Sequence, residues 1–367
     1  MAVSDTVTDR DPELDVLRGL ALIGVCIMNY HGYLVLRGAT PGDGLLARVF
    51  DPWRGPLATR FAAVFVTVAG VGVVLLTHRA RSSGDRAAIS AVRWVLVRRG
   101  VLLFAFGWFL DWVWPGTILF FYGAYFLMAA ALFTLRCRWL VLIGAMAAVA
   151  AAAVQWWSVD RMHHGHDTSW LLQGESEATK SPRDLLFDVA VRGTHPLLPW
   201  LVFLCLGMVL GRRLIDGRLH VIARTQLAFA GVLAVATGYV LRDSLPVDAT
   251  LRSTFPVDRG LLYVLTTLGS TAVAIAVVGP LARRWSSSAP VRWLAVTGRT
   301  TLTLYVLHVL CFGLVVDWLE WVRPGGLTTS LLFAAVFWVV AVAAANLWSR
   351  VRPLGPLEWW YRRFSRA

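Results

Sequence analysis

Three polar side chains lie inside long apolar stretches of this 367-residue sequence: the amide of Asn29 and the imidazoles of His31 and His308, which could act as acid or base. If the first apolar stretch crosses a membrane as a helix, Asn29 lies roughly 20 Å beyond Asp15, because each residue advances the helix by ~1.5 Å. His308 lies a similar depth into a later apolar stretch. Polar groups at that depth are costly and indicate function. We therefore predict a catalytic site of His308, Asn29 and His31 with an imidazole as general base; the alternative is that these groups only hydrogen-bond neighbouring helices.

A second set of residues suggests an anion site at the opposite ends of the same helices. Arg18, Arg98, Arg99 and Arg299 all stand at one end of an apolar stretch, and Thr300 follows Arg299 where a helix is expected to begin. A helix N-terminus with guanidinium and hydroxyl groups can bind phosphate. We predict phosphate binding by these five residues, although arginines also collect at the inner ends of membrane helices for topological reasons.

Two further residues are candidates for substrate binding. Asp111 ends the third apolar stretch and could orient a histidine, and His195 precedes a proline-rich helix start. A loop with His163, His164 and His166 resembles a metal motif, but these ligands are too close in sequence to complete a tetrahedral site. We therefore predict a solvated loop and no metal.

The composition is that of a membrane protein. Apolar residues make up 57% of the chain, with 18 Trp and 18 Phe, and several stretches reach the ~20 residues that cross a bilayer. We predict an all-α fold, a polytopic membrane helical bundle of about ten transmembrane helices. The expected spans lie near 16–36, 59–77, 94–114, 117–135, 139–157, 197–211, 225–241, 260–281, 296–318 and 328–348.

The charge distribution predicts the orientation of these spans. With both termini in the cytoplasm, 23 of the 35 Lys and Arg fall in inner segments and 12 in outer ones, as the positive-inside rule requires. This bias accounts for the net charge of +13, so no nucleic-acid partner is expected. Residues 1–13 do not read as a cleavable signal. The predicted domains are a disordered N-terminal tail (1–12), a transmembrane domain (13–349) and a cytoplasmic amphipathic, basic tail (350–367).

Four short motifs, in order along the chain, resemble one family. They are Leu-Asp-Val-Leu-Arg-Gly-Leu-Ala-Leu at 14–22 followed by Asn29-Tyr30, His-Pro-Leu-Leu-Pro-Trp at 195–200 with Gly-Arg at 211–212, Gly-Arg-Thr-Thr-Leu-Thr-Leu-Tyr-Val-Leu-His at 298–308, and Gly-Pro-Leu-Glu-Trp at 355–359. Together they resemble the heparan-alpha-glucosaminide N-acetyltransferase group and the bacterial YeiB-like branch of that transmembrane acyltransferase superfamily.

The resemblance implies transfer of an acetyl group from cytosolic acetyl-CoA, through the membrane, to an outer acceptor. It also implies that Asn29 is an active-site amide. The family's catalytic histidine lies eleven residues after that Asn, where this chain has Thr40, so His31 or His308 becomes the candidate base. The bacterial O-acyltransferases share a similar beginning but place a histidine at the position of Asn29, which disfavours them.

The function predicted from the sequence is therefore a membrane acyltransferase of the bacterial plasma membrane. Its donor would be acetyl-CoA or another acyl-CoA, and its acceptor an amine or hydroxyl of a sugar or envelope glycolipid. The alternatives are a non-enzymatic transporter or exporter of a lipid or small solute, and a catalytically lapsed relative acting as a partner subunit. The sequence leaves open the acceptor, the acyl length, N- versus O-acylation, and the oligomeric state, including a homodimer.

Overall fold

The computed structural model describes residues 12–40, 42–172 and 181–366, and within them it is helical, with no strands. Residues 1–11 of the predicted tail and the stretch around Lys180 lie outside the described residues. The helices are α1 (Glu13–Leu36), α2 (Leu45–Val49), α3 (Arg60–Ser83), α4 (Arg86–Asp111), α5 (Leu119–Leu132), α6 (Cys137–His163), α7 (Ser169–Leu172), α8 (Pro182–Phe187), α9 (Leu197–Ile215), α10 (Val221–Ser244), α11 (Leu261–Arg284), α12 (Ala289–Arg299), α13 (Thr301–Phe312), α14 (Leu327–Ser349) and α15 (Pro356–Arg366). π-Helical turns η1 (Asp188–Arg192) and η2 (Gly313–Trp318) complete the set.

The predicted fold class is confirmed, because every expected span coincides with a described helix. Among the described residues, eight helical segments are long and apolar enough to cross a membrane. They are α1, α3, α6, α9, α10, α11, the α13–η2 segment and α14.

The remaining two expected spans, α4 and α5, differ from a simple crossing. Helix α4 begins at Arg86, eight residues before its expected start, because the Asp85 carboxylate accepts hydrogen bonds from the backbone N–H groups of Ala87 and Ala88 at 2.9 and 3.3 Å. Helix α5 has 14 residues. At ~1.5 Å per residue it is about 21 Å long, shorter than a ~30 Å hydrocarbon core. It packs against α4 as the second arm of a hairpin.

The ninth expected span is two helices rather than one. Helix α12 ends at Arg299, Thr300 has non-helical backbone angles (φ −114°, ψ 24°), and α13 starts at Thr301. The Thr300 hydroxyl donates back to the carbonyls of Val296 and Thr297. The break therefore creates a second helix N-terminus inside the bundle.

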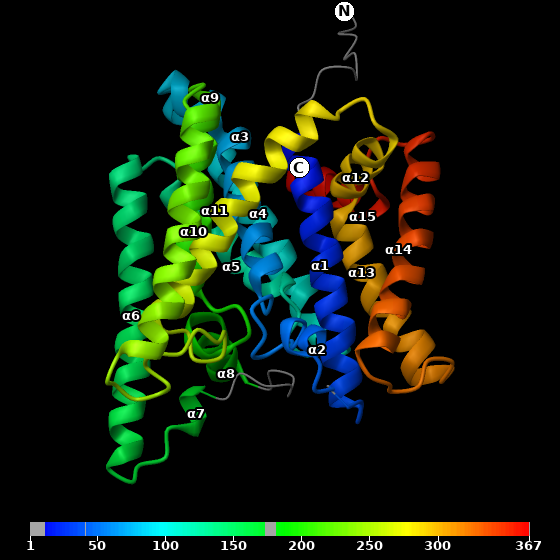
Figure 1. Cartoon of the computed structure of the whole chain (residues 1–367). Coiled ribbons are helices and arrows are strands. Elements are labelled where there is room, and N and C mark those ends of the chain that lie inside the picture. Colours follow the sequence, from blue (N-terminus) through cyan, green and yellow to red (C-terminus); the bar gives the residue numbers. More distant parts are fainter. Residues whose placement is uncertain (1–11, 41, 173–180, 367) are drawn as a thin grey trace, which may run out of the picture.

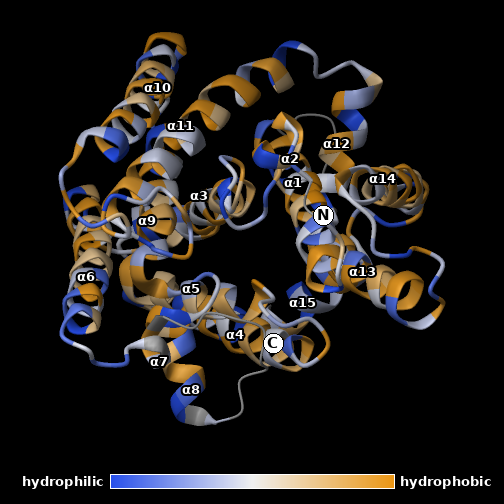
Figure 2. Ribbon diagram, turned by 60° about the horizontal axis from the view of Figure 1, so that its bottom comes forward, coloured by the Kyte–Doolittle hydropathy of each residue, from blue (hydrophilic) through white to orange (hydrophobic). Residues whose placement is uncertain are grey.

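The helices form one bundle with α6 and α10 on one side, α13 and α14 on the opposite side, and α1 and α3 between them (Figure 1). Apolar residues cover most of the long helices, while hydrophilic residues collect at their ends and in the connecting loops (Figure 2). This pattern is typical of a bundle that spans a membrane.

Close helix contacts depend on glycine, as two positions illustrate. A Cβ on Gly207 of α9 would lie 1.9 Å from the carbonyl oxygen of Thr67 in α3, and one on Gly298 of α12 would lie 1.7 Å from that of Asp15 in α1. Small residues allow such backbone approach in membrane helices. The second contact is important for the site because it holds the end of α12 against the first turns of α1.

A buried ion pair fixes the N-terminus of α1. Glu13 is 2% exposed, and its carboxylate accepts hydrogen bonds at 2.8 and 2.9 Å from the guanidinium of Arg224 in α10, which is 4% exposed. Arg283 of α11 lies 3.0 Å from the same carboxylate. Because a buried charge is costly without a partner, this cluster stabilises α1, α10 and α11 in one arrangement.

The orientation of the bundle can be tested by accessibility labelling. In a cysteine-free background, we expect His166→Cys to react with a membrane-impermeant maleimide added outside intact cells. Ser287→Cys should react only after the cells are opened. Both positions are exposed on the protein, so burial does not limit either reaction. The reverse pattern would contradict the cytoplasmic placement of the termini.

Candidate active site

The structure places Asn29 and His308 in direct contact. The Nδ2 atom of Asn29 in α1 lies 3.1 Å from Nε2 of His308 in α13, and His308 is fully buried. The neighbouring Tyr30 hydroxyl donates to the carbonyl oxygen of His308 at 3.0 Å, which locks the two helices in register. The pair thus joins two helices that are separated by most of the chain.

The hydrogen bonds around His308 define its tautomer. Its Nδ1 contacts the carbonyl oxygen of Tyr305, which can only accept, so Nδ1 carries the proton. Nε2 then offers a lone pair, and the Asn29 amide must present its NH₂ group to it. One Asn29 N–H binds His308, and the other N–H and Oδ1 can contact a ligand.

Asn29 also lines a cavity of about 400 Å³, a size suited to a small molecule. Its walls combine one face of α1 with several loops from one end of the bundle. They include Val25, Gly32 and Leu36 of α1, Trp53 after α2, Pro115 and Gly116 after α4, Thr194 and His195 before α9, Val257 and Arg259 before α11, and Tyr305 of α13. Asn29 therefore lies between the buried His308 and this cavity.

Two cavity residues, Arg259 and His195, contribute to its electrostatic character. The Arg259 guanidinium donates to the backbone carbonyls of Val191, Arg192 and Gly193 at 2.6 to 2.8 Å. Burial, together with the charge of Arg259, lowers the pKa of His195 to about 3, so this imidazole is neutral near pH 7. Burial also lowers the pKa of Arg259 to about 10, which still leaves it charged. The cavity wall thus includes a fixed cation and a neutral imidazole, besides Arg37, which is paired with Asp317.

Asp111 does not line the cavity but holds a residue that does, Gly116. Its carboxylate accepts a hydrogen bond at 2.8 Å from the backbone N–H of Gly116, and the Tyr33 hydroxyl donates to the carbonyl oxygen of Pro115. Asp111 is 4% exposed. It is not among the residues that line the cavity, whereas Pro115 and Gly116 are. The structure therefore supports a role for Asp111 in holding this turn rather than in touching a substrate.

His31 points to a different neighbour from Asn29. Its Nδ1 lies 3.2 Å from the Ser330 hydroxyl of α14, and the residue is fully buried. Among the described residues its Nε2 has no hydrogen-bond partner. His31 does not line the cavity, because two residues of helix turn its side chain to the far side of α1 from Asn29.

Arg18 shares a helix face with Asn29. Eleven residues separate them, about 20° more than three full turns, and the rise places Asn29 about 16 Å farther along α1. The Arg18 guanidinium lies 3.2 Å from Asp15 and packs against Gly72 of α3, where an added Cβ would come within 3.0 Å of it. Arg299 lies beside the same turn of α1, since Gly298 contacts the backbone of Asp15.

The other predicted phosphate-binding residues are more dispersed. Arg98 is exposed on α4. The Arg99 guanidinium lies 5.4 Å from the Tyr361 ring centre and donates to the Ser365 hydroxyl of α15 at 3.3 Å. The Thr300 hydroxyl is satisfied by its own helix, as described above. These contacts connect Arg99 with the C-terminal helix rather than with Arg18.

The helix N-terminus expected to bind phosphate instead holds a carboxylate of the chain itself. Glu358 of α15 accepts hydrogen bonds from the backbone N–H groups of Leu302 and Thr303 at 2.5 and 3.0 Å, and from the Thr303 hydroxyl at 2.6 Å. A carboxylate satisfies the unpaired N–H groups of a helix start as a phosphate would. The Gly-Pro-Leu-Glu-Trp motif thus caps α13, the helix that carries His308.

The described residues contain no group of three or more His, Cys, Asp or Glu side chains arranged to hold a metal ion. In the histidine loop, His163 lies 3.4 Å from Asp248, and His164 lies 3.8 Å from Asp160. These are exposed contacts between neighbouring loops and helix ends.

Two cavity residues were not assigned to the site from the sequence. Tyr305 lies one turn before His308, and its hydroxyl bonds the Thr117 hydroxyl and the backbone N–H of Ile118, both at 3.1 Å. The helical spacing to His308 could have identified it. Arg259 gave no sequence signal, because its role depends on the carbonyls of a distant loop.

These features define a class of protein: a multi-pass membrane protein with an amide–imidazole pair beside an internal cavity. The chain belongs to the family described as heparan-alpha-glucosaminide N-acetyltransferase, catalytic, which matches residues 10–247, about two thirds of its length. It is thus a member of a transmembrane acetyltransferase family. A second family, described as a protein of unknown function (DUF418), matches residues 216–367. Both matches confirm the resemblance seen in the sequence motifs.

A curated relative is the uncharacterized 39.9 kDa protein in the amylase 3′ region of Bacillus acidopullulyticus. It is 32% identical over 117 residues, which is 32% of this chain and 32% of that protein. The similarity therefore spans about a third of the relative's length. Within the chain itself, Asn29 lies in the acetyltransferase match and His308 in the second match, so the site is built from both.

Proposed function

We propose that this protein transfers an acetyl group from cytosolic acetyl-CoA to an amine or hydroxyl at the outer side of the bacterial plasma membrane. The acceptor would be a sugar or an envelope glycolipid. One observation carries the proposal: Asn29 contacts the buried His308 and also lines a cavity whose walls include the loops at one end of the bundle, while Arg18 lies toward the other end on the same face of α1.

This geometry fits a donor that reaches through the bundle. The phosphates of acetyl-CoA would bind Arg18 and Arg299, where α12 contacts α1, and the thioester would reach Asn29. Guanidinium groups suit phosphate because their N–H donors pair with its oxygens. The acceptor would occupy the cavity beside Asn29, with His195 and Tyr305 in its wall.

The chemistry follows from the donors and acceptors of the pair. The acceptor's nitrogen or oxygen attacks the thioester carbonyl carbon, and the second N–H of Asn29 stabilises the resulting oxyanion. As the amide turns toward that oxygen, it releases Nε2 of His308, which takes the acceptor's proton. The tetrahedral intermediate then collapses, the C–S bond breaks, and the CoA thiolate leaves and takes the proton from the His308 imidazolium, which restores the neutral base.

The direct test uses purified protein in liposomes with acetyl-CoA carrying a ¹⁴C-acetyl group. An extract of bacterial envelope lipids and glycans is the acceptor. We expect time-dependent transfer of label to an extractable product, and none from protein carrying both Asn29→Ala and His308→Ala. A transporter would instead move solute without acetyl-CoA and would leave the label on CoA.

Donor binding gives a separate prediction. Arg18→Gln should weaken acetyl-CoA binding by about 1.5–3 kcal/mol, the scale of a hydrogen bond to a charged group, because it removes a cation that would contact the donor's phosphates. Calorimetry on the folded variant measures this change. Arg98→Gln, which alters an exposed arginine on α4, is the matched control and should bind normally. Equal affinities for the two variants would remove Arg18 from the donor site.

A further inference from the structure

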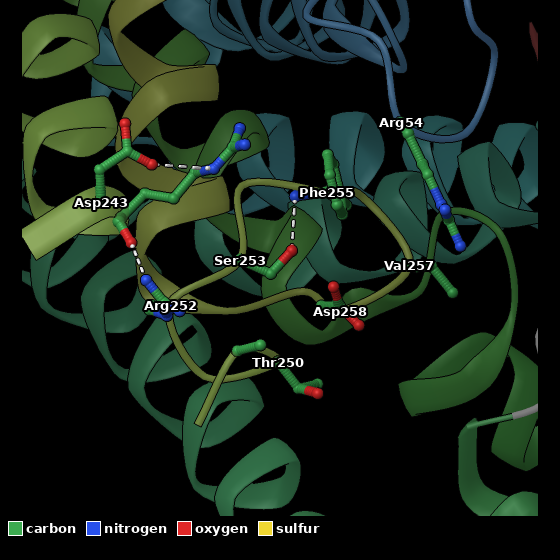
Figure 3. Close-up of a pocket in the computed structure, with 10 residues that line it drawn as sticks. Arg54, Asp243, Thr250, Arg252, Ser253, Phe255, Val257 and Asp258 are labelled. Atoms are coloured by element: carbon green, nitrogen blue, oxygen red, sulfur yellow. Dashed lines mark hydrogen bonds and ion pairs between the residues drawn. The ribbon is translucent and has the colours of Figure 1, made fainter. Parts of the chain in front are cut away.

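The loop between α10 and α11 lines a second cavity, next to the first. This cavity has a volume of about 490 Å³, and its walls include three arginines, Arg54, Arg242 and Arg252 (Figure 3). Arg242 lies in the last turn of α10, Arg252 in the α10–α11 loop, and Arg54 in the loop after α2. Val257 lines both cavities, so the two share a wall.

The charges in this second cavity are not balanced. Its walls carry two acids, Asp243 and Asp258, against the three arginines. Asp243 is 77% exposed, and its 3.6 Å contact with Arg242 is a weak surface pair. Asp258 adjoins the buried Arg259 of the first cavity, which supplies a further positive charge. The two cavities therefore share a region of excess positive charge.

Arg252 also has an unused donor. One of its terminal nitrogens donates to the carbonyl oxygen of Arg242 at 3.0 Å (Figure 3). Its Nε is buried and has no hydrogen-bond partner among the described residues. A buried donor without an acceptor is costly, so a ligand oxygen at this position would be stabilising. Figure 3 shows Arg54 reaching toward the same loop from the opposite side.

We propose that this second cavity is a binding site for a phosphate ester. Three guanidinium groups from three separate segments suit an anion with several oxygens better than a planar carboxylate, which a single guanidinium can satisfy. We further infer that the site holds the phosphate of a phosphorylated acceptor; this inference rests on the proposed function. The two cavities adjoin at Val257. An acceptor whose phosphate binds in the second cavity would extend past Val257 and present its amine or hydroxyl in the cavity beside Asn29. The phosphate belongs to a soluble ester or to a lipid headgroup.

The test measures binding without acetyl-CoA, using the full-length protein in phosphatidylcholine nanodiscs. One arm titrates sn-glycerol 3-phosphate, with glycerol as the neutral control. The other arm replaces part of the phosphatidylcholine with phosphatidylglycerol and measures retention of that lipid after purification. Binding of the soluble ester identifies a soluble source, and selective retention of phosphatidylglycerol identifies a lipid headgroup; either result supports the site.

Substitutions of the cavity arginines test whether the phosphate probe binds in the second cavity. Arg252→Gln and Arg54→Gln should each weaken the observed binding about tenfold or more, as expected for loss of a charged hydrogen bond. Arg323→Gln changes an exposed arginine before α14 that lines neither cavity, and it should bind as the original protein does. Elution volume and thermal unfolding establish that each variant is folded.

Two results would overturn the site. One is failure of the unmodified protein to prefer either phosphate probe over its neutral control. The other is unchanged binding in both folded cavity variants. Neither measurement depends on turnover, so phosphate binding without acetyl transfer would reject the proposed function alone. Acetyl transfer with no phosphate preference would reject this site alone.

Discussion

Replacement of His308 by alanine is expected to lower acetyl transfer by about 10²–10⁴-fold, the usual contribution of a general base. The tautomer fixed by Tyr305 leaves Nε2 as the only basic nitrogen of this imidazole, and it faces Asn29. The substitution removes that base and leaves Arg18 and Arg299 in place. Acetyl-CoA affinity should therefore change little. The measurement is a transfer assay with saturating donor, together with calorimetry on the same preparation.

A second variant separates proton transfer from simple positioning. His308→Gln can still accept a hydrogen bond from Asn29 through its side-chain oxygen, but an amide is not a base. If His308 only orients Asn29, the glutamine variant should recover much of the activity that alanine loses. If His308 takes the proton, both variants should be similarly impaired. Near-normal turnover in His308→Ala would contradict both roles.

His31→Ala provides a comparison within the same bundle. This imidazole contacts Ser330 and does not line the cavity, so its loss should lower stability more than turnover. If a folded His31→Ala protein lost most of its turnover, His31 rather than His308 would become the candidate general base. Thr40, at the position where the family has its histidine, is exposed and also lies outside the cavity wall.

The sequence predicted where the long apolar helices lie and that two key polar groups share a level of the bundle, but not the break between α12 and α13. A helix has a constant rise, so counting residues from the ends of the apolar stretches put Asn29 and His308 at similar depths. Which helices are neighbours is a different matter, because it depends on packing between distant segments. The sequence could not distinguish Asn29, which meets His308, from His31, which meets Ser330 on the opposite face of α1.

The predicted anion site at the start of α13 shows a second limit of prediction from the sequence. The sequence predicted a helix start near Thr300, and α13 does begin at Thr301. The sequence could not show that Glu358, 55 residues after Thr303, folds back and places its carboxylate at this helix start. Long-range contacts of this kind decide whether a local binding motif is free for a ligand. The two cavities have the same origin, since their walls come largely from loops that meet only in the folded bundle.

Two substitutions of Asn29 should separate its two contacts, and the aspartate variant is the more informative. Asn29→Ala removes the N–H group that we propose as donor to the thioester oxygen and should lower turnover about 10²–10³-fold, the effect of losing one oxyanion donor. Asn29→Asp keeps the size of the side chain but places a carboxylate where an oxyanion must form. That carboxylate would also favour a protonated His308, which could no longer accept a proton.

We therefore expect the aspartate variant to be at least as impaired as the alanine variant, although its shape is closer to the original. Single-turnover assays of all three proteins at equal donor occupancy measure this order. If Asn29→Asp kept most of its activity, the amide could not be the oxyanion donor, since a carboxylate at neutral pH has no N–H to give. The Asn29–His308 contact would then serve to join α1 to α13, and the acetyl carbonyl would have to bind elsewhere in the cavity wall.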